Sequence, residues 1–159
     1  MSKRLVHEMA YDAPQDAVLA MLADPAFREE VCDYQRVLRK TVTIDSNPSG
    51  MTVVIDQFQS VQGLPSFATK LVGDDVNIIQ RETWTGGRGD IEVTIPGKPG
   101  DMKGSAVLAG SGEQTTEKVD MTIKVGIPLV GGKIEGLISD LLLKALKAEH
   151  KVGRDYLTR

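Results

Sequence analysis

The C-terminal part of the chain, residues 126–159, carries the one long helical pattern in the sequence. Over residues 129–157 apolar side chains recur at helical spacing, and the run Leu141-Leu142-Leu143 breaks the alternation that a strand needs. The apolar face of this helix is predicted to hold Ile134, Leu137, Ile138, Leu141, Leu142, Ala145, Ala148, Val152 and Tyr156. Such a helix would be about 40 Å long, because each residue adds ~1.5 Å. It must therefore cross a whole small domain and bury its apolar face against another layer.

The two ends of this helix have their own signals. Pro128 suits a first helical turn, because the N–H that proline lacks has no partner there. Glu149 lies at the edge of the apolar face, where we expect its carboxylate to reach water, and His150 falls on the polar side and is expected at the surface.

Most of the chain ahead of this helix has the pattern of strands. Residues 3–11 alternate between polar and apolar positions and predict a first strand, and two short helices follow over 14–23 and 24–32. Six further strands are predicted over 34–45, 51–61, 76–85, 90–96, 102–111 and 116–125, with a short helix over 66–73. In the last strand the alternation leaves one apolar and one polar face, which is typical of an antiparallel sheet covered on one side.

Length and composition fit one globular domain over residues 1–159. The chain has 159 residues, of which 41% are hydrophobic and 26% charged, and a net charge of −3, which does not favour a nucleic-acid surface. No apolar run approaches the ~20 residues of a membrane span. The N-terminus lacks the continuous apolar core of a secretory signal, so we expect a cytoplasmic protein.

Cysteine and histidine are too scarce for common metal or disulfide chemistry. Cys32 is the single cysteine, which excludes an internal disulfide and a cysteine-based metal cage. His7 and His150, the two histidines, stand at opposite ends of the chain. We therefore expect neither a metal site nor a cofactor.

Two stretches carry a resemblance to a known family, namely GLPSFATKLVGDDVNIIQRETW and the later GIPLVGGKIEGLISDLLLKALKAEHKVGRDYL. With this order of elements, the chain resembles the START-like or birch-pollen-allergen-like (SRPBCC) superfamily, and an actinobacterial branch of it known only as a domain of unknown function. The resemblance covers essentially the whole chain. It implies the helix-grip fold, an α+β fold with a seven-stranded antiparallel sheet curved around a long C-terminal helix and two short helices between strands 1 and 2. Relatives bind lipids, sterols, polyketides or plant hormones, and some are cyclases or aromatases, so the fold alone does not choose an activity.

The residues themselves give an independent argument for a cavity. Small side chains on facing surfaces, such as Gly104 and Ala106 on a strand and Ala145 on the helix, leave room between the two layers. A core that simply closes up is the alternative. If the cavity exists, the residues expected to line it and bind a ligand are Phe58, Ile78, Gln80, Glu82, Trp84, Val93, Met121, Leu137 and Leu141.

The strand VNIIQRETW is the most informative polar feature. Period two places Gln80 and Glu82 on one face with Trp84, so all three point inward if the tryptophan does. A carboxylate in an apolar cavity would have a raised pKa and could orient a ligand hydroxyl or act as an acid or base. In the alternative, Ile79 points inward and Glu82 is solvated. His7 is more simply a hydrogen-bonded core histidine, although together with Glu82 it would form a proton-relay pair.

The sequence shows no convincing catalytic machinery and favours binding over catalysis. We expect binding or transport of an apolar small molecule, such as a lipid, a fatty acyl group or a polyketide-like compound. A cyclase- or dehydratase-like enzyme that uses Glu82 and perhaps His7 is the second hypothesis. A ligand-free interaction module is the third, and the sequence does not indicate an oligomeric state.

Overall fold

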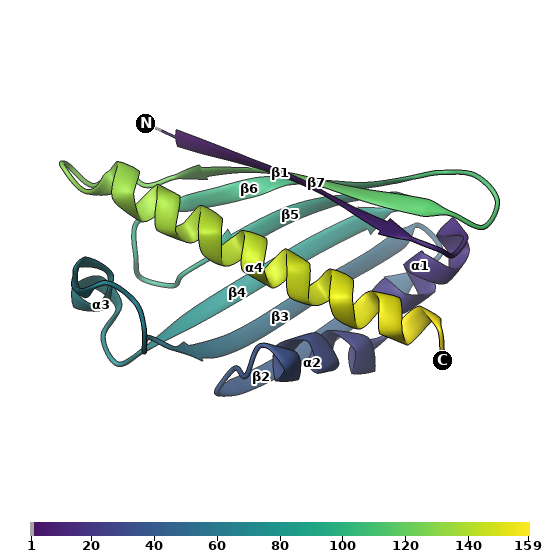
Figure 1. Ribbon diagram of the computed structural model, residues 1–159, viewed down its shortest axis with the longest axis horizontal. Helices are drawn as coiled ribbons and strands as arrows, with labels where there is room; N and C mark the ends of the chain where they lie inside the picture. Colours follow the sequence, from purple (N-terminus) through teal and green to yellow (C-terminus); the bar gives the residue numbers. More distant parts are fainter. Residues whose placement is uncertain (1) are drawn as a thin grey trace.

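The structure, a computed structural model, describes residues 2–159 and forms one curved antiparallel sheet with a long helix across its concave side (Figure 1). The seven strands lie in the order β1-β7-β6-β5-β4-β3-β2. They are β1 (Ser2–Tyr11), β2 (Arg39–Asn47), β3 (Gly50–Ser60), β4 (Asp75–Thr85), β5 (Arg88–Thr94), β6 (Asp101–Ala109) and β7 (Thr115–Lys124). The helices are α1 (Gln15–Leu22), α2 (Pro25–Tyr34), α3 (Ser66–Val72) and α4 (Gly131–Leu157). The predicted α+β architecture is confirmed.

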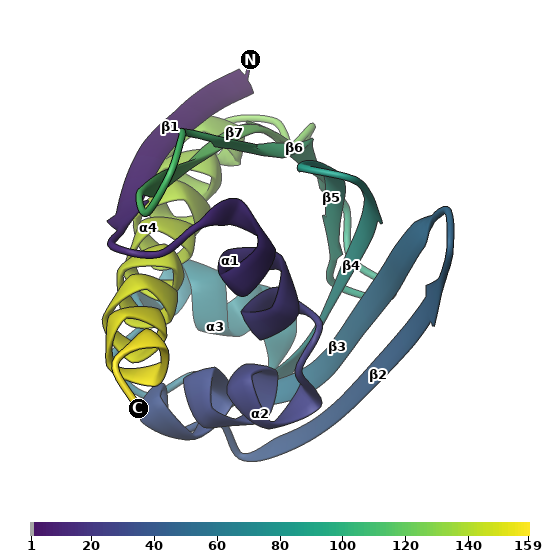
Figure 2. The same ribbon diagram turned by 90° about the vertical axis from the view of Figure 1, so that its right-hand side faces the viewer.

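The sheet pairs its neighbours in antiparallel fashion throughout, and its first and last strands along the chain lie side by side. β1 pairs with β7 from Ser2 opposite Lys124 to Tyr11 opposite Thr115. Figure 2 shows how the sheet curls so that one edge strand, β1, lies against α4, whereas α2 lies between α4 and the other edge strand, β2. Alternate residues of β3, from Met51 to Gln57, are buried, so the inner face of the sheet is the one toward the helix.

The two short helices between β1 and β2 close one end of the curved sheet (Figure 2). Asp24 caps α2, because its carboxylate accepts a hydrogen bond from the Ala26 N–H at 2.9 Å. α2 runs to Tyr34, and Arg36 then adopts a positive φ of 58° before the chain enters the sheet at Arg39. The strand predicted from residue 34 therefore begins five residues later.

The long helix begins at Gly131 and not at residue 129, and Pro128 lies before it. The chain turns first, with Leu129 at a positive φ of 70° and the Gly131 N–H donating to the Ile127 carbonyl at 2.9 Å. A Cβ on Gly131 would lie 2.4 Å from the Val125 carbonyl oxygen, so only glycine fits where the helix starts. This close approach of Gly131 to the end of β7 places the start of the helix at residue 131. The hydrophobic pattern of the sequence gives no sign of it.

The two halves of α4 have different surroundings. The C-terminal half packs tightly, since Ala148 and Val152 are buried and the Cβ position of Gly153 lies 2.9 Å from the Tyr11 ring. In the N-terminal half, Leu141 is 41% exposed although it belongs to the apolar face. The apolar face is therefore only partly packed, and its remaining part faces open space. Within residues 2–159, no helix is both long and apolar enough to cross a membrane.

Candidate functional site

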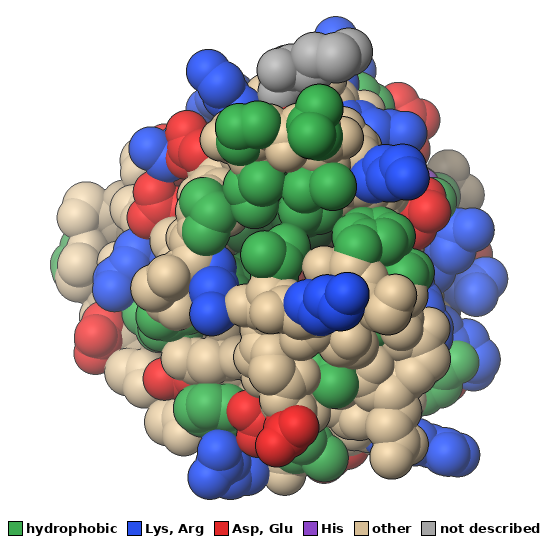
Figure 3. Space-filling model, turned by 90° about the vertical axis from the view of Figure 1, so that its left-hand side faces the viewer, with side chains coloured by type: hydrophobic (Ala, Val, Ile, Leu, Met, Phe, Trp, Pro, Cys, Tyr) green, Lys and Arg blue, Asp and Glu red, His purple; other side chains and the backbone are tan. Residues whose placement is uncertain are grey.

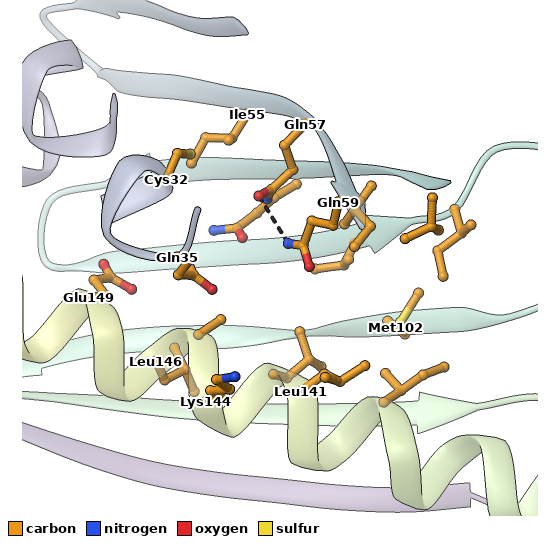
Figure 4. A pocket seen from close by; sticks show the side chains of 18 of the residues that line it. Cys32, Gln35, Ile55, Gln57, Gln59, Met102, Leu141, Lys144, Leu146 and Glu149 are labelled. Carbon is orange, nitrogen blue, oxygen red and sulfur yellow. Dashed lines mark hydrogen bonds between the residues drawn. The ribbon is translucent and has the colours of Figure 1, made fainter. Parts of the chain in front are cut away.

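A cavity of about 590 Å³ lies between the inner face of the sheet and α4, and α2 and α3 form its two ends. Its walls are mostly aliphatic side chains and methionines. From the sheet these are Ile55, Val76, Ile78, Ile91, Val93, Ile95, Met102, Val119 and Met121, and from α4 they are Ile134, Leu137, Ile138, Leu141, Leu142, Ala145 and Leu146. Figure 4 shows side chains of the sheet and of α4 pointing toward each other across this space. The expected cavity is present in the structure.

The α3 end of the cavity is its apolar end. Leu64, Ala68, Leu71 and Val72, all in or beside α3, line it. Seen from this side of the molecule, hydrophobic side chains gather around a hollow in the surface (Figure 3).

Glutamine amides on the sheet add hydrogen-bonding groups to the wall. Gln57 and Gln59 of β3 both line the cavity, and the Gln59 side chain donates to Gln57 Oε1 at 3.1 Å (Figure 4). Lys144 of α4 lines it as well, between Leu141 and Glu149 (Figure 4).

Most of the residues expected to bind a ligand lie on the cavity wall. The structure places there Ile78, Gln80, Glu82, Val93, Met121, Leu137 and Leu141. Trp84 is buried on the same face of β4, although it lies beyond the cavity surface. Gln80 and Glu82 point inward, and the alternative facing with Ile79 inward is wrong.

Phe58 is misplaced in the sequence-based prediction. Its neighbours Gln57 and Gln59 line the cavity, so alternation along β3 turns Phe58 to the outer face. There the guanidinium of Arg39, its cross-strand partner, lies 4.2 Å from the centre of the ring. The prediction failed because it assumed that the phenylalanine of this strand faces inward, and the structure turns the glutamines inward instead.

The end of the cavity opposite α3 holds ionisable groups from four elements: Arg28 of α2, Glu82 of β4, Glu117 of β7 and Glu149 of α4. We call this set the charged end. Arg28 and Glu82 form a salt bridge with two hydrogen bonds, Nη1 to Oε2 at 3.0 Å and Nη2 to Oε1 at 2.8 Å. Both side chains are almost completely buried, and Arg28 Nε donates to the Leu22 carbonyl at 2.9 Å.

Glu82 is ionised, and both oxygens of its carboxylate accept hydrogen bonds. Trp84 Nε1 donates to its Oε1 at 2.8 Å, and the Gln80 amide donates to its Oε2. Burial alone would raise the pKa of Glu82, but the charge of Arg28 and these hydrogen bonds hold the pKa below its ordinary value. The predicted raised pKa of Glu82 is therefore wrong, because the sequence pattern did not reveal Arg28 as its partner.

Glu149 does not reach water freely as expected but lines the cavity, with 13% of its side chain exposed. Its Oε1 lies 3.9 Å from Arg28 Nη1. Burial raises the pKa of Glu149 to about 7. The positive charge of Arg28 lowers this pKa in part, and the negative charge of Glu82 raises it. A helical wheel could not anticipate this, since α2 covers the edge on which Glu149 lies.

Glu117 is the second carboxyl group without a close basic partner. It is 3% exposed, and its Oε1 has no hydrogen-bond partner within residues 2–159. Burial raises its pKa well above the ordinary value, and the charges of Glu149 and Glu82 raise it further.

Sequence reasoning missed both Glu117 and Arg28, although signals for them exist. Glu117 shares the inward phase of β7 with Val119 and Met121. Arg28 lies four residues from buried Cys32 on the inner face of α2.

His7 takes no part in this site. Its Nε2 is buried without a hydrogen-bond partner in the described part of the chain. Burial lowers its pKa, as do the charges of His150 and Lys147 on α4, the helix that packs against β1. No hydrogen bond links it to Glu82, whose side-chain partners are Arg28, Gln80 and Trp84, and the predicted relay pair is wrong. His150, expected at the surface, is half-buried and lies 2.8 Å from the Ala10 carbonyl.

Across residues 2–159, no group of three or more His, Cys, Asp and Glu side chains is arranged to hold a metal ion.

Residues 6–157 match the model of a protein family of unknown function, DUF2505. A curated relative from Mycobacterium tuberculosis (strain H37Rv), the uncharacterized protein Rv0481c, is 30% identical over 122 residues, which are 72% of this chain and 70% of the relative.

Solved structures with the same fold cover nearly the whole chain. TTHA0849 from Thermus thermophilus has a TM-score of 0.67 at 18% identity, over 98% of this chain and 97% of that one. A START superfamily protein from Mycobacterium smegmatis has a TM-score of 0.61 at 14% identity, over 95% and 97%. The Zhui aromatase/cyclase from Streptomyces sp. R1128 has a TM-score of 0.60 at 11% identity, over 99% and 92%. The fold is thus that of the START-like superfamily.

Proposed function

Because this chain belongs to the DUF2505 family and has a START-like fold, we propose that it binds or transports an apolar small molecule in the cavity between the sheet and α4. A lipid, a fatty acyl compound or a polyketide-like compound has the right character. Solved structures with this fold include a START superfamily protein and an aromatase/cyclase, which is compatible with a small organic ligand here.

One observation carries this proposal, namely a cavity of about 590 Å³ with a largely aliphatic wall. Ligand sites of proteins fall in the range of roughly 300–1,000 Å³ and combine apolar walls with a few placed polar groups. A domain that only needed stability would fill such a space, because each empty volume forfeits packing energy. Binding would rest mainly on apolar area removed from water, at ~25 cal/mol per Å² before ordering costs.

The experiment is to purify the protein, extract it with organic solvent and identify bound compounds by mass spectrometry. In parallel, the protein stripped of ligand is titrated with Nile red, a neutral dye that fluoresces in apolar surroundings. We expect a co-purified apolar compound or saturable dye binding at one site. A protein that yields no compound and takes up no dye would overturn the proposal.

A cyclase- or dehydratase-like enzyme is a second candidate, favoured by the position of Glu149. This carboxyl group lines the cavity with a pKa of about 7, which suits a general acid or base at neutral pH. Glu82 suits that role poorly, because the salt bridge to Arg28 occupies both its oxygens. If a co-purified compound is converted by the protein, Glu149→Gln should abolish the turnover, whereas Glu113→Gln in an exposed turn should not.

The third candidate, a ligand-free interaction module, has the least support. Such a module would have no use for a cavity of this size.

A further inference from the structure

The charged end of the cavity contains more carboxyl groups than basic groups. Arg28 directs two of its five N–H groups at Glu82 and its Nε–H at a backbone carbonyl, so most of its donors and its charge are already paired. Glu149 approaches it only to 3.9 Å. Glu117 forms no salt bridge within residues 2–159, its Oε1 makes no hydrogen bond there, and the charge of Arg28 offsets only part of the rise in its pKa. Two carboxyl groups are therefore left without a full partner.

Both groups line the same end of the cavity, Glu117 from β7 and Glu149 from α4. The charge of Glu149 is the largest charge effect on the pKa of Glu117. A buried acceptor without a donor destabilises the protein, and a ligand group that donates to it removes this cost.

The chemistry of these two carboxyl groups indicates which polar head group a ligand would carry at this end of the cavity. A carboxylate head would add a further negative charge beside three carboxyl groups, and the one guanidinium is already committed to Glu82. A hydroxyl head can donate to one of the two groups and accept from the other when that group is protonated, but it carries no charge to stabilise an ionised carboxylate. A primary ammonium head carries three donors and a positive charge, so it can serve Glu117 and Glu149 together.

We propose that the charged end is a subsite for a protonated primary amine, and that the ligand is an apolar amine whose ammonium group is held between Glu117 and Glu149 and whose chain extends along the aliphatic wall toward α3. This inference rests on the proposed binding function and specifies its ligand class.

Binding of such an amine is coupled to proton release. In the empty cavity burial favours the protonated form of both carboxyl groups, because it raises the pKa of Glu149 to about 7 and the pKa of Glu117 well above its ordinary value. The incoming ammonium stabilises the ionised form of a carboxyl group, and that group gives its proton to solvent. The charged and titratable groups around the pair are Arg28 of α2, Glu82 of β4 and Tyr11 of β1, and Lys144 of α4 lines the same cavity. Of these, Arg28 stays a cation, Glu82 stays ionised, and the raised pKa of Tyr11 keeps it neutral.

The test compares three ligands with the same chain: dodecylamine, dodecanol and dodecanoate. Each is titrated into the ligand-stripped protein at pH 7 and followed by calorimetry. We expect dodecylamine to bind at least roughly tenfold more tightly than dodecanoate and dodecanol, the gain expected of one or more charge-assisted hydrogen bonds. Repeating the amine titration in two buffers of different ionisation enthalpy should reveal net proton release.

Two isosteric variants identify the residues. Glu117→Gln and Glu149→Gln should each reduce the affinity for dodecylamine by roughly tenfold and change the affinity for dodecanol much less. Glu113→Gln, the same substitution in an exposed turn, should leave the amine affinity unchanged. Neither buried substitution should impair folding, because each removes a buried group that ionises with difficulty, and thermal unfolding checks this.

The outcomes separate this inference from the proposed function. Binding of all three ligands with equal affinity, or a preference for the acid or the alcohol, would overturn the amine subsite and leave the apolar cavity in place. Equal amine binding by the wild type and both variants would overturn it as well. If none of the three ligands binds and Nile red does not bind either, the proposed function itself fails.

Discussion

Arg28 of α2 and Glu82 of β4, 54 positions apart in the sequence, form a salt bridge with two hydrogen bonds of 3.0 and 2.8 Å in the interior. Trp84 and Gln80 complete the hydrogen bonding of the carboxylate. The pair attaches α2 to an inner strand of the sheet. It also keeps one carboxyl group of the charged end ionised while burial pushes Glu117 and Glu149 toward the neutral form.

Removing Arg28 should destabilise the fold strongly. Arg28→Met leaves the Glu82 carboxylate buried without its cation, so we expect the free energy of unfolding to fall by about 3–5 kcal/mol. The double variant Arg28→Met/Glu82→Leu should lose less than the single variant, because no uncompensated charge remains. Urea unfolding measures both, and Arg4→Met, which breaks an exposed salt bridge to Asp120, serves as the control with a much smaller effect. A single variant as stable as the wild type would contradict the role of the pair.

Glu149 should make stability fall as the pH rises. Its pKa is about 7 in the folded protein and about 4.5 when the group is unperturbed, so between these values the folded state holds a proton that the unfolded chain has released. The penalty grows through this range and is complete above pH 7, at about 3 kcal/mol. Glu149→Gln removes it, so this variant should be more stable than the wild type at pH 8 and nearly equal at pH 4.5.

Urea unfolding at pH 4.5, 6 and 8 tests this pH dependence. Glu117 acts in the same direction, so some dependence remains in the variant. Parallel curves for the wild type and Glu149→Gln would refute the assignment to Glu149.

Filling the cavity should abolish binding while the fold persists. Ala145 lines the cavity from α4, and Ala145→Leu adds three carbon atoms there without breaking the helix. We expect Nile red to bind at least roughly tenfold more weakly, with the free energy of unfolding unchanged to within about 1 kcal/mol or raised.

Phe58→Leu is the control for the cavity-filling variant, because Phe58 lies on the outer face of β3 beneath Arg39. It should leave dye binding intact. Weaker binding by both variants to the same extent would mean that the dye does not occupy the cavity.

A methyl group at Gly89 should disturb the environment of Trp84. The Cβ position of Gly89 lies 2.6 Å from the indole ring, so Gly89→Ala forces the ring to move and strains its hydrogen bond to Glu82. We expect a loss of about 1–3 kcal/mol in the free energy of unfolding and a changed emission spectrum from this single tryptophan.

Gly87→Ala provides the matched control in the same hairpin. A Cβ at Gly87 meets its nearest atoms at 3.4 Å, so this substitution should be nearly neutral. Equal losses in the free energy of unfolding for Gly87→Ala and Gly89→Ala would show that the indole is not tightly packed against Gly89.

Local patterns in the sequence determined most of the fold. Period two identified the strands and the facing of Gln80 and Glu82, and period 3.6 identified the long helix, because a residue's face within one element depends only on backbone geometry. The prediction for Phe58 failed for another reason, since hydrophobic character was taken to decide the facing of a strand in which glutamines point inward. The helical pattern placed the start of the helix two residues early, because Gly131 is positioned by the end of β7.

The charged end was decided by the tertiary structure alone. Arg28, Glu82, Glu117 and Glu149 come from four elements that are distant in the sequence, and only the curling of the sheet around α4 brings them to one place. Their ionisation follows from that meeting, because Arg28 keeps Glu82 charged, whereas burial and neighbouring negative charge raise the pKa of Glu117. The sequence by itself thus determined the sheet, the helix and the apolar wall between them. The ionisation of the groups in the cavity depends on the distances between them and on their burial, and neither can be read from a single segment of the sequence.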